Sequence, residues 1–172
     1  MAEQVKNIFL IGMMGTWKST VGKILGEKLP YSHIDLDHKI EEFFNMSVAD
    51  IFSELGEHKF RECEEAYFCE KAKIGGYIVS TGGGTIMSIK NRRSLSKNGL
   101  SILLKTDPNI IASRIRKPNK RPLLANSKNM AETLKKLWHE RKSIYLDCAD
   151  IVICNDELTP VETANLICQK IS

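Results

Sequence analysis

Apolar residues follow two different spacings along the chain, and the two spacings alternate from one end to the other. Short, mostly apolar runs that close on a glycine or a polar residue predict buried strands. We expect these strands at 5–12, 31–37, 77–84, 99–106 and 150–155. Because helical segments separate them, they predict one parallel sheet covered by helices on both faces, a three-layer α/β fold.

The segments between the strands carry apolar residues three and four positions apart, which predicts amphipathic helices. Two helix starts are marked by residues that cap helices. Ser47 precedes an apolar stripe that runs to Leu55, and Thr159 is followed by Pro160, a residue favoured in the first turn. The expected helices lie at 18–29, 47–55, 59–73, 107–117, 129–149 and 159–171.

Composition excludes several classes of protein. A chain of 172 residues with 42% hydrophobic and 27% charged residues fits one soluble domain, 1–172. Its longest apolar runs are far shorter than the roughly 20 residues of a membrane helix, and the N-terminus lacks a secretory signal pattern, so we expect no membrane partner. The net charge of +4 suits small anionic substrates and is too scattered to indicate nucleic acid. The odd number of cysteines, without C-x-x-C spacing, predicts reduced thiols in the cytoplasm rather than a zinc site: Cys63, Cys69, Cys148, Cys154 and Cys168.

Residues 12–20, GMMGTWKST, almost match the phosphate-binding pattern G-x-x-x-x-G-K-[ST]. Gly12, Lys18 and Ser19 fit it, and Trp17 stands where the second glycine belongs. A strand that turns into a helix at this point directs backbone N–H groups and the positive helix end at one spot. Lys18 adds charge for phosphates, and Ser19 offers a hydroxyl to magnesium. The alternative is an ordinary turn between a strand and a helix.

Further candidate groups follow the predicted strands, where parallel sheets bind their ligands. Asp35 and Asp37 would face one side if the strand persists to residue 37; alternatively, Asp37 only caps the next helix. Three glycines at 82–84 suggest a backbone that approaches a ligand closely. The basic segment 116–129 is too long for a simple connection. Arginine suits bidentate capture of carboxylate or phosphate, although each candidate taken alone could be a solvated surface residue: Arg61, Arg121 and Arg141.

Taken together, six motifs in this order resemble shikimate kinase: GMMGTWKST, DLD, FRECEE, STGGG, RPLL and ERKSIY. The resemblance covers essentially the whole chain. It implies the P-loop fold of the nucleoside-monophosphate-kinase type, with a five-stranded parallel sheet, a helical substrate-binding region at about 37–64 and a mobile lid at about 116–129. It also implies transfer of a phosphoryl group from ATP to the 3-hydroxyl of shikimate, a step of aromatic amino acid biosynthesis, with Mg²⁺ as cofactor. We expect a monomer whose partner is this small molecule.

The resemblance assigns roles to single residues. Lys18 and the backbone amides around it would hold the ATP phosphates, in a loop made of Gly12, Gly15, Thr16, Trp17, Lys18, Ser19 and Thr20. Ser19 would bind Mg²⁺ directly and Asp35 through water. An arginine at 114 or 116 would lie by the adenine, and we take Arg114 as the candidate.

For the acceptor, Asp37 would accept hydrogen bonds from the shikimate hydroxyls. Arg61 and Arg141 would hold the carboxylate, with Glu64 orienting Arg61, and Gly82, Gly83 and Gly84 would line the ring. Arg121 would move in with the lid and stabilise the transferring phosphoryl group. The catalytic residues implied are therefore Lys18, Asp37 and Arg121.

Trp17 is the departure from the family pattern, because a Cβ is unwelcome where the backbone passes the phosphates. If the backbone angle there is one that only glycine tolerates comfortably, the strain would be about 1–3 kcal/mol, or roughly 5- to 150-fold in ATP affinity. Alternatively, the ring closes the empty nucleotide pocket. The sequence alone therefore predicts that Trp17 reduces activity and that Trp17→Gly tightens ATP. Three functions remain open: a working shikimate kinase, a non-enzymatic kinase-like domain that has lost ATP, and another small-molecule kinase of this fold, such as a gluconate kinase.

Overall fold

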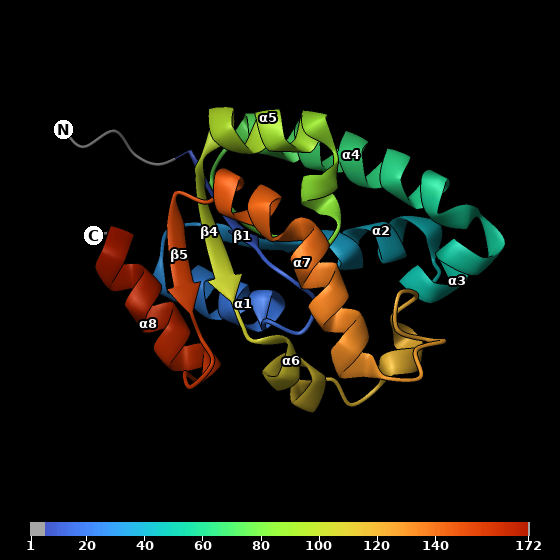
Figure 1. Cartoon of the computed structure of the whole chain (residues 1–172). Helices are drawn as coiled ribbons and strands as arrows, with labels where there is room; N and C mark the ends of the chain where they lie inside the picture. The colour runs from blue at the N-terminus through green and yellow to red at the C-terminus, as the bar shows by residue number, and fades with distance from the viewer. Residues whose placement is uncertain (1–5, 172) are drawn as a thin grey trace.

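The computed structural model describes residues 6–171 as a five-stranded parallel sheet between two layers of helices (Figure 1). The strands are β1 (Asn7–Ile11), β2 (Ser32–Asp35), β3 (Tyr77–Ser80), β4 (Leu100–Lys105) and β5 (Ile151–Cys154), in the spatial order β2-β3-β1-β4-β5. The helices are α1 (Lys18–Lys28), α2 (Leu36–Phe44), α3 (Val48–Glu54), α4 (Gly56–Ile74), α5 (Ile89–Asn98), α6 (Pro108–Arg114), α7 (Met130–Cys148) and α8 (Pro160–Ile171), with 3-10 turns at Thr85–Met87 and Pro118–Lys120.

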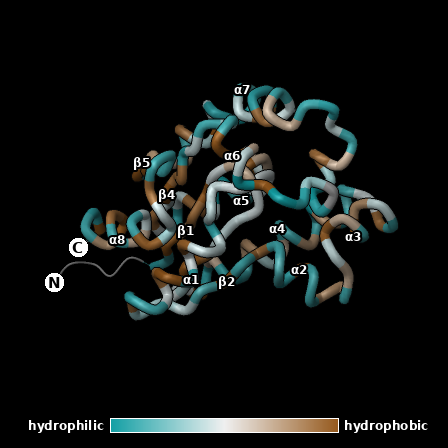
Figure 2. Tube along the Cα trace, turned by 90° about the horizontal axis from the view of Figure 1, so that it is seen from below, coloured by the Kyte–Doolittle hydropathy of each residue, from teal (hydrophilic) through white to brown (hydrophobic). Residues whose placement is uncertain are grey.

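Alternate residues of the central strand serve two separate cores. Ile8 and Leu10 of β1 pack with α1 and α8, whereas Phe9 and Ile11 pack with α4, α5, α6 and α7. Hydrophobic stretches accordingly follow the strands in the middle of Figure 2, and hydrophilic stretches lie mostly at the periphery. A strand buried on both faces needs apolar residues at every position, which explains the continuous run at the start of the chain.

Parallel pairing brings the carboxyl ends of all five strands to one edge of the sheet. β1 lies between β3 and β4, with Leu10 opposite Ser80 and Ile11 opposite Leu103. β2 pairs with the other side of β3 and places Asp35 opposite Ser80. The loops that follow these strands therefore meet at the same edge.

The expected strands and helices are confirmed, with strand ends one or more residues shorter than expected; Val5, the expected start of the first strand, lies outside the described residues. Ser47 caps α3 through the N–H of Asp50, and the Thr159 hydroxyl accepts from the N–H of Glu162. The five cysteines are free thiols. No helix within 6–171 has the length and apolar content to cross a membrane.

Two features differ from the sequence-based expectation. The strand at 31–37 ends at Asp35, because the Asp35 carboxylate accepts the N–H of His38 and starts α2 as its cap. Asp37 therefore lies in the first turn of a helix and is neither a strand residue nor the cap. The second feature is α5, which the sequence analysis did not anticipate.

The segment 116–129 contains some local structure, namely the 3-10 turn at Pro118–Lys120 and the buried side chain of Leu124.

Candidate active site

The loop between β1 and α1 has the backbone of a phosphate-binding loop. Gly12 (φ 145°) and Gly15 (φ 75°) adopt conformations that favour glycine. A Cβ on Gly12 would lie 2.5 Å from the carbonyl oxygen of Leu104, so no larger residue fits there. The turn ends at Lys18, where α1 begins and presents its free N–H groups together with the exposed Ser19 and Thr20.

Lys18 is buried inside this loop. Its Nζ donates to the carbonyl oxygens of Gly12 (2.8 Å) and Met13 (2.7 Å). Burial lowers the pKa of Lys18 to about 8, although the nearby Asp37 carboxylate works in the opposite direction. The ammonium is thus held by the backbone, at the end of a helix that also attracts anions.

Trp17 has a left-handed backbone (φ 68°, ψ 22°), a conformation that favours glycine and meets the condition stated in the sequence analysis. Its ring centroid lies 3.5 Å from Cζ of Arg114, a stacked cation–π contact. The Arg114 guanidinium is fixed in turn by the carbonyl oxygens of Asn155 (2.8 Å) and Asp156 (3.2 Å). Of the two candidate arginines, Arg114 contacts Trp17, while Arg116 is exposed beside the same cavity.

The loop already adopts this conformation in the folded chain, so the backbone strain of Trp17 lowers the free energy of unfolding. Only a change in backbone on binding would transfer that cost to ATP affinity. The sequence analysis converted this strain directly into a loss of ATP affinity. The loop geometry does not support that conversion. The effect of Trp17 on ATP affinity remains a prediction.

Asp35 at the end of β2 and Asp37 in the first turn of α2 line the same cavity as Lys18 and Ser19, about 420 Å³ in volume. Burial raises the pKa of Asp37 to about 6, with further contributions from the Glu64 and Asp35 carboxylates. Asp37 is therefore the carboxylate of this cavity whose charge changes near neutral pH.

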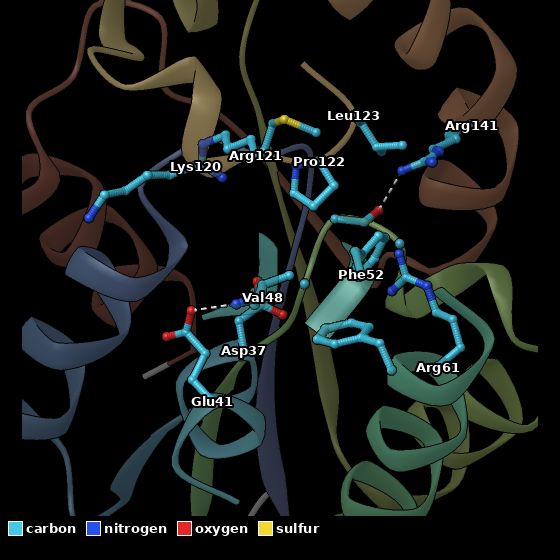
Figure 3. A pocket seen from close by; sticks show the side chains of 15 residues that line it. Asp37, Glu41, Val48, Phe52, Arg61, Lys120, Arg121, Pro122, Leu123 and Arg141 are labelled. Carbon is cyan, nitrogen blue, oxygen red and sulfur yellow. Dashed lines mark hydrogen bonds between the residues drawn. The ribbon is translucent and has the colours of Figure 1, made fainter. Parts of the chain in front are cut away.

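A second cavity of about 210 Å³ adjoins the first and is lined by groups of opposite character (Figure 3). Arg61 and Arg141 lie at one side and Asp37 toward the other. The wall between them combines Phe52, Phe60, Val48 and the glycine segment 82–84 with Lys120, Arg121, Pro122 and Leu123 from the loop above. Such a pocket can hold a small polar molecule with one anionic end.

Arg61 is oriented by a buried acid. Its Nη1 donates to Glu64 at 2.8 Å, and the other Glu64 oxygen accepts from the Thr85 hydroxyl at 2.6 Å. Glu64 is only 1% exposed, so both oxygens need these partners. The orienting role expected for Glu64 agrees with this geometry.

Two of the three glycines, Gly82 and Gly84, leave space that other groups of the site occupy. A Cβ on Gly84 would collide with the Arg61 guanidinium, and one on Gly82 would lie 2.7 Å from Oδ1 of Asp37. Both glycines have φ values open to other residues, so the constraint is space and not backbone conformation.

Tyr145 is a site residue that the sequence analysis missed. Its hydroxyl donates to the carbonyl oxygen of Gly83, which also accepts from Nη1 of Arg141 at 3.2 Å. The side chain is fully buried and stacks on Trp138. Arg141 and Tyr145 are four residues apart on α7, so helical spacing from the expected arginine could have found it.

A third cavity, about 330 Å³, completes a row. It shares Gly15, Trp17 and Arg121 with the cavity at Lys18, which in turn shares Met14, Asp37, Glu41, Gly83 and Arg121 with the cavity at Arg61 and Arg141. Every residue expected at the site from the sequence lines one of the three cavities, except Gly12, Thr16 and Glu64, which lie behind their walls. Arg121 alone lines all three.

A P-loop at the carboxyl edge of a parallel sheet, next to a pocket for a small anion, defines a small-molecule kinase of the P-loop class. A family model described as shikimate kinase matches residues 14–172. The shikimate kinase of Sulfurihydrogenibium sp. is 41% identical over 97% of this chain and 98% of its own length. The structure of shikimate kinase from Acinetobacter baumannii in complex with shikimate superposes with a TM-score of 0.93 and 32% identity, covering 98% of this chain and 94% of that one.

The chain belongs to the shikimate kinase family, and the resemblance drawn from its six motifs is confirmed. It is a small-molecule kinase, and membership in this family implies the use of ATP.

Tyr145→Phe tests whether the Gly83 carbonyl must be held in place. The change removes one hydroxyl and one hydrogen bond, so we expect the KM for shikimate to rise several-fold while the KM for ATP stays the same. Steady-state kinetics with both substrates measures this. Tyr67→Phe on α4, outside the three cavities, is the matched control. Equal changes in both KM values would contradict a local positioning role.

Proposed function

We propose that the chain transfers the γ-phosphoryl group of ATP to the 3-hydroxyl of shikimate, which yields shikimate 3-phosphate and ADP. The row of three adjoining cavities carries this proposal, because it offers one place each for the acceptor, the phosphates and the nucleoside. The similarity to a structure whose title names a shikimate complex supports the choice of acceptor.

Shikimate, a small carboxylate with three hydroxyls, suits the cavity between Arg61 and Asp37. Arg61 and Arg141 would bind its carboxylate as charge-assisted pairs. Asp37 would accept from the hydroxyls at the other side, and the backbone of 82–84 would lie against the ring. Helices α2, α3 and the start of α4 contribute one side of this cavity, which supports a substrate-binding region at 37–64: Asp37, Glu41, Val48, Phe52, Phe60 and Arg61.

The triphosphate would lie over the N-terminus of α1, with the amides of 15–20 and the Lys18 ammonium as its ligands. Mg²⁺ fits the same cavity, because the Ser19 hydroxyl and the Asp35 carboxylate are hard oxygen donors. No group of three or more possible metal-ligating side chains occurs among residues 6–171, so phosphate and water oxygens would complete the coordination. When bound, Mg²⁺ would offset charge on the phosphates.

In the transfer step, the 3-hydroxyl oxygen bonds to the γ-phosphorus while the bond from that phosphorus to the β–γ bridging oxygen breaks. The hydroxyl proton passes to the Asp37 carboxylate, and ADP leaves with the bond electrons. Lys18 and Arg121 offset the negative charge that spreads over the equatorial oxygens. Closure of the lid segment 116–129 would bring Arg121 in and exclude water, which would otherwise hydrolyse ATP.

A coupled assay that follows ADP release separates this function from its alternatives. With ATP present, we expect turnover with shikimate and none with gluconate, since the two arginines and the triple glycine form a pocket for a cyclic carboxylate. Turnover with gluconate and not with shikimate would indicate a gluconate kinase of the same fold. No turnover with either would indicate a non-enzymatic domain.

Arg61→Lys and Arg141→Lys test the carboxylate site. Lysine keeps the charge and loses the planar fork, so the KM for shikimate should rise about tenfold or more with little effect on the KM for ATP. The exposed Arg93 on α5 provides the matched control, Arg93→Lys. Parallel increases in both KM values would contradict the assignment.

Arg121→Ala tests the lid arginine. Because its contact would form mainly in the transition state, kcat should fall by about 10²- to 10³-fold while shikimate affinity changes little. Lys128→Ala removes an exposed charge from the same segment and should leave kcat unchanged. A normal kcat for Arg121→Ala would show that Arg121 is only a surface charge.

The two shifted pKa values predict a bell-shaped pH dependence. Transfer needs ionised Asp37, whose pKa is raised to about 6, and protonated Lys18, whose pKa is lowered to about 8. kcat/KM for shikimate should therefore fall as the pH drops below about 6, and kcat/KM for ATP should fall above about 8. A profile that is flat from pH 5 to 9 would contradict these roles.

A further inference from the structure

Asn155, the first residue after β5, has a side chain that reaches the phosphate-binding loop from behind. The residue is fully buried, and its backbone N–H continues the pairing of β5 with β4 by donating to the carbonyl oxygen of Lys105 at 3.1 Å. Its amide nitrogen donates to the carbonyl oxygen of Thr16 at 3.1 Å. Its amide oxygen accepts from the hydroxyl of Thr106, the first residue after β4. Both ends of the amide are therefore bonded, and its orientation is fixed.

The bond to Thr16 holds one of the two peptide groups that flank the Trp17 Cα. The peptide group after Trp17 is held by α1, because the Trp17 carbonyl oxygen accepts the N–H of Val21 at 2.8 Å. The peptide group before Trp17 is held by Asn155 through the Thr16 carbonyl. With both groups held, the Trp17 backbone stays left-handed (φ 68°, ψ 22°), a conformation that is strained in any residue other than glycine.

The same bond sets the direction of a backbone donor. No peptide bond among residues 6–171 is cis, so the C=O of Thr16 and the N–H of Trp17 point in opposite directions. Because the Thr16 oxygen points to Asn155, the N–H of Trp17 points away from Asn155. Trp17 lines the cavity of about 420 Å³ together with Lys18 and Ser19, where the phosphates would lie, whereas Asn155 lies behind its lining residues.

We propose that Asn155 is a positioning residue for ATP, which holds the Thr16–Trp17 peptide group so that its N–H faces the phosphates despite the backbone strain at Trp17. The proposal rests on the proposed function, since it assumes that the triphosphate lies on the loop 12–20. A loop with glycine at position 17 needs less support, because glycine adopts the left-handed region without strain. The buried amide of Asn155 and the departure from the loop motif at Trp17 therefore act as a pair.

Asn155→Ala removes the amide, and magnesium tripolyphosphate tests the loop without a base. Isothermal titration should show that this variant binds tripolyphosphate and MgATP about tenfold more weakly, while the dissociation constant for shikimate stays the same. The double variant Trp17→Gly/Asn155→Ala should lose only about twofold or less relative to Trp17→Gly, because glycine relieves the strain that Asn155 opposes.

Asn7→Ala is the matched control. Asn7 is as buried as Asn155 and its amide nitrogen also donates to backbone carbonyls, those of Ala72 and Asn98, but it lies at the amino end of β1, at the opposite edge of the sheet from the loop. This change should lower the melting temperature and leave the affinity for both phosphate probes unchanged. A loss of phosphate affinity in Asn7→Ala equal to that in Asn155→Ala would overturn the proposal, since the effect would then be one of general stability.

Thr106→Val is a milder variant that decides the question if Asn155→Ala does not fold. It leaves the Asn155 amide in place and removes the hydroxyl that orients it, so tripolyphosphate should bind about two- to threefold more weakly. Unchanged tripolyphosphate affinity in the folded variant, an equal loss of shikimate affinity, or the same loss with glycine at position 17 would overturn the proposal alone. Absence of shikimate phosphorylation by the unmodified chain in the coupled assay would overturn the proposed function as well.

Discussion

The parallel pairing of β1 with β3 and β4 is the constraint on which the site depends. It forces the loops after β1 and β3 to leave the sheet side by side, so that Gly83 lies against the backbone of Met14. The same edge receives α2 from β2, which brings Asp37 to the cavity that Lys18 lines. Residues far apart in the sequence, such as Met14 and Gly83, therefore meet at this edge. The helices on the two faces keep these loops fixed through two continuous cores.

Burial of charge shapes the chemistry of this edge. Lys18 and Asp37 are both partly stripped of water, and the pKa of each moves toward neutrality for that reason. The buried Glu64 carboxylate bonds to Arg61 and Thr85, and this pairing leaves Arg61 aimed into the acceptor cavity. Lys18 and Arg121 line one cavity, so an anion bound there would meet two cations.

The sequence predicted the parts of this molecule that are governed by local rules. Periodicity located the five strands, and the cap signals at Ser47 and Thr159 located two helix starts. The sequence did not identify the cap of α2, because both Asp35 and Asp37 are suitable caps. The choice between them depends on where β2 stops pairing with β3. Helical spacing from Arg141 could have indicated Tyr145, which the sequence analysis missed. The stack of Trp17 on Arg114 was out of reach, because this contact joins segments that only the fold brings together. Spacing along one chain does not encode such encounters.

The central claim is that the three cavities hold acceptor, phosphates and base in one row. A crystal structure of the chain with shikimate, Mg²⁺ and a non-hydrolysable ATP analogue tests it most directly. The account predicts the shikimate carboxylate between Arg61 and Arg141, a hydroxyl on Asp37, the triphosphate over Lys18 and the base in the cavity lined by Arg114 and Trp17. A complex in which shikimate binds with its carboxylate away from both arginines, or in which the triphosphate avoids the loop 12–20, would contradict it.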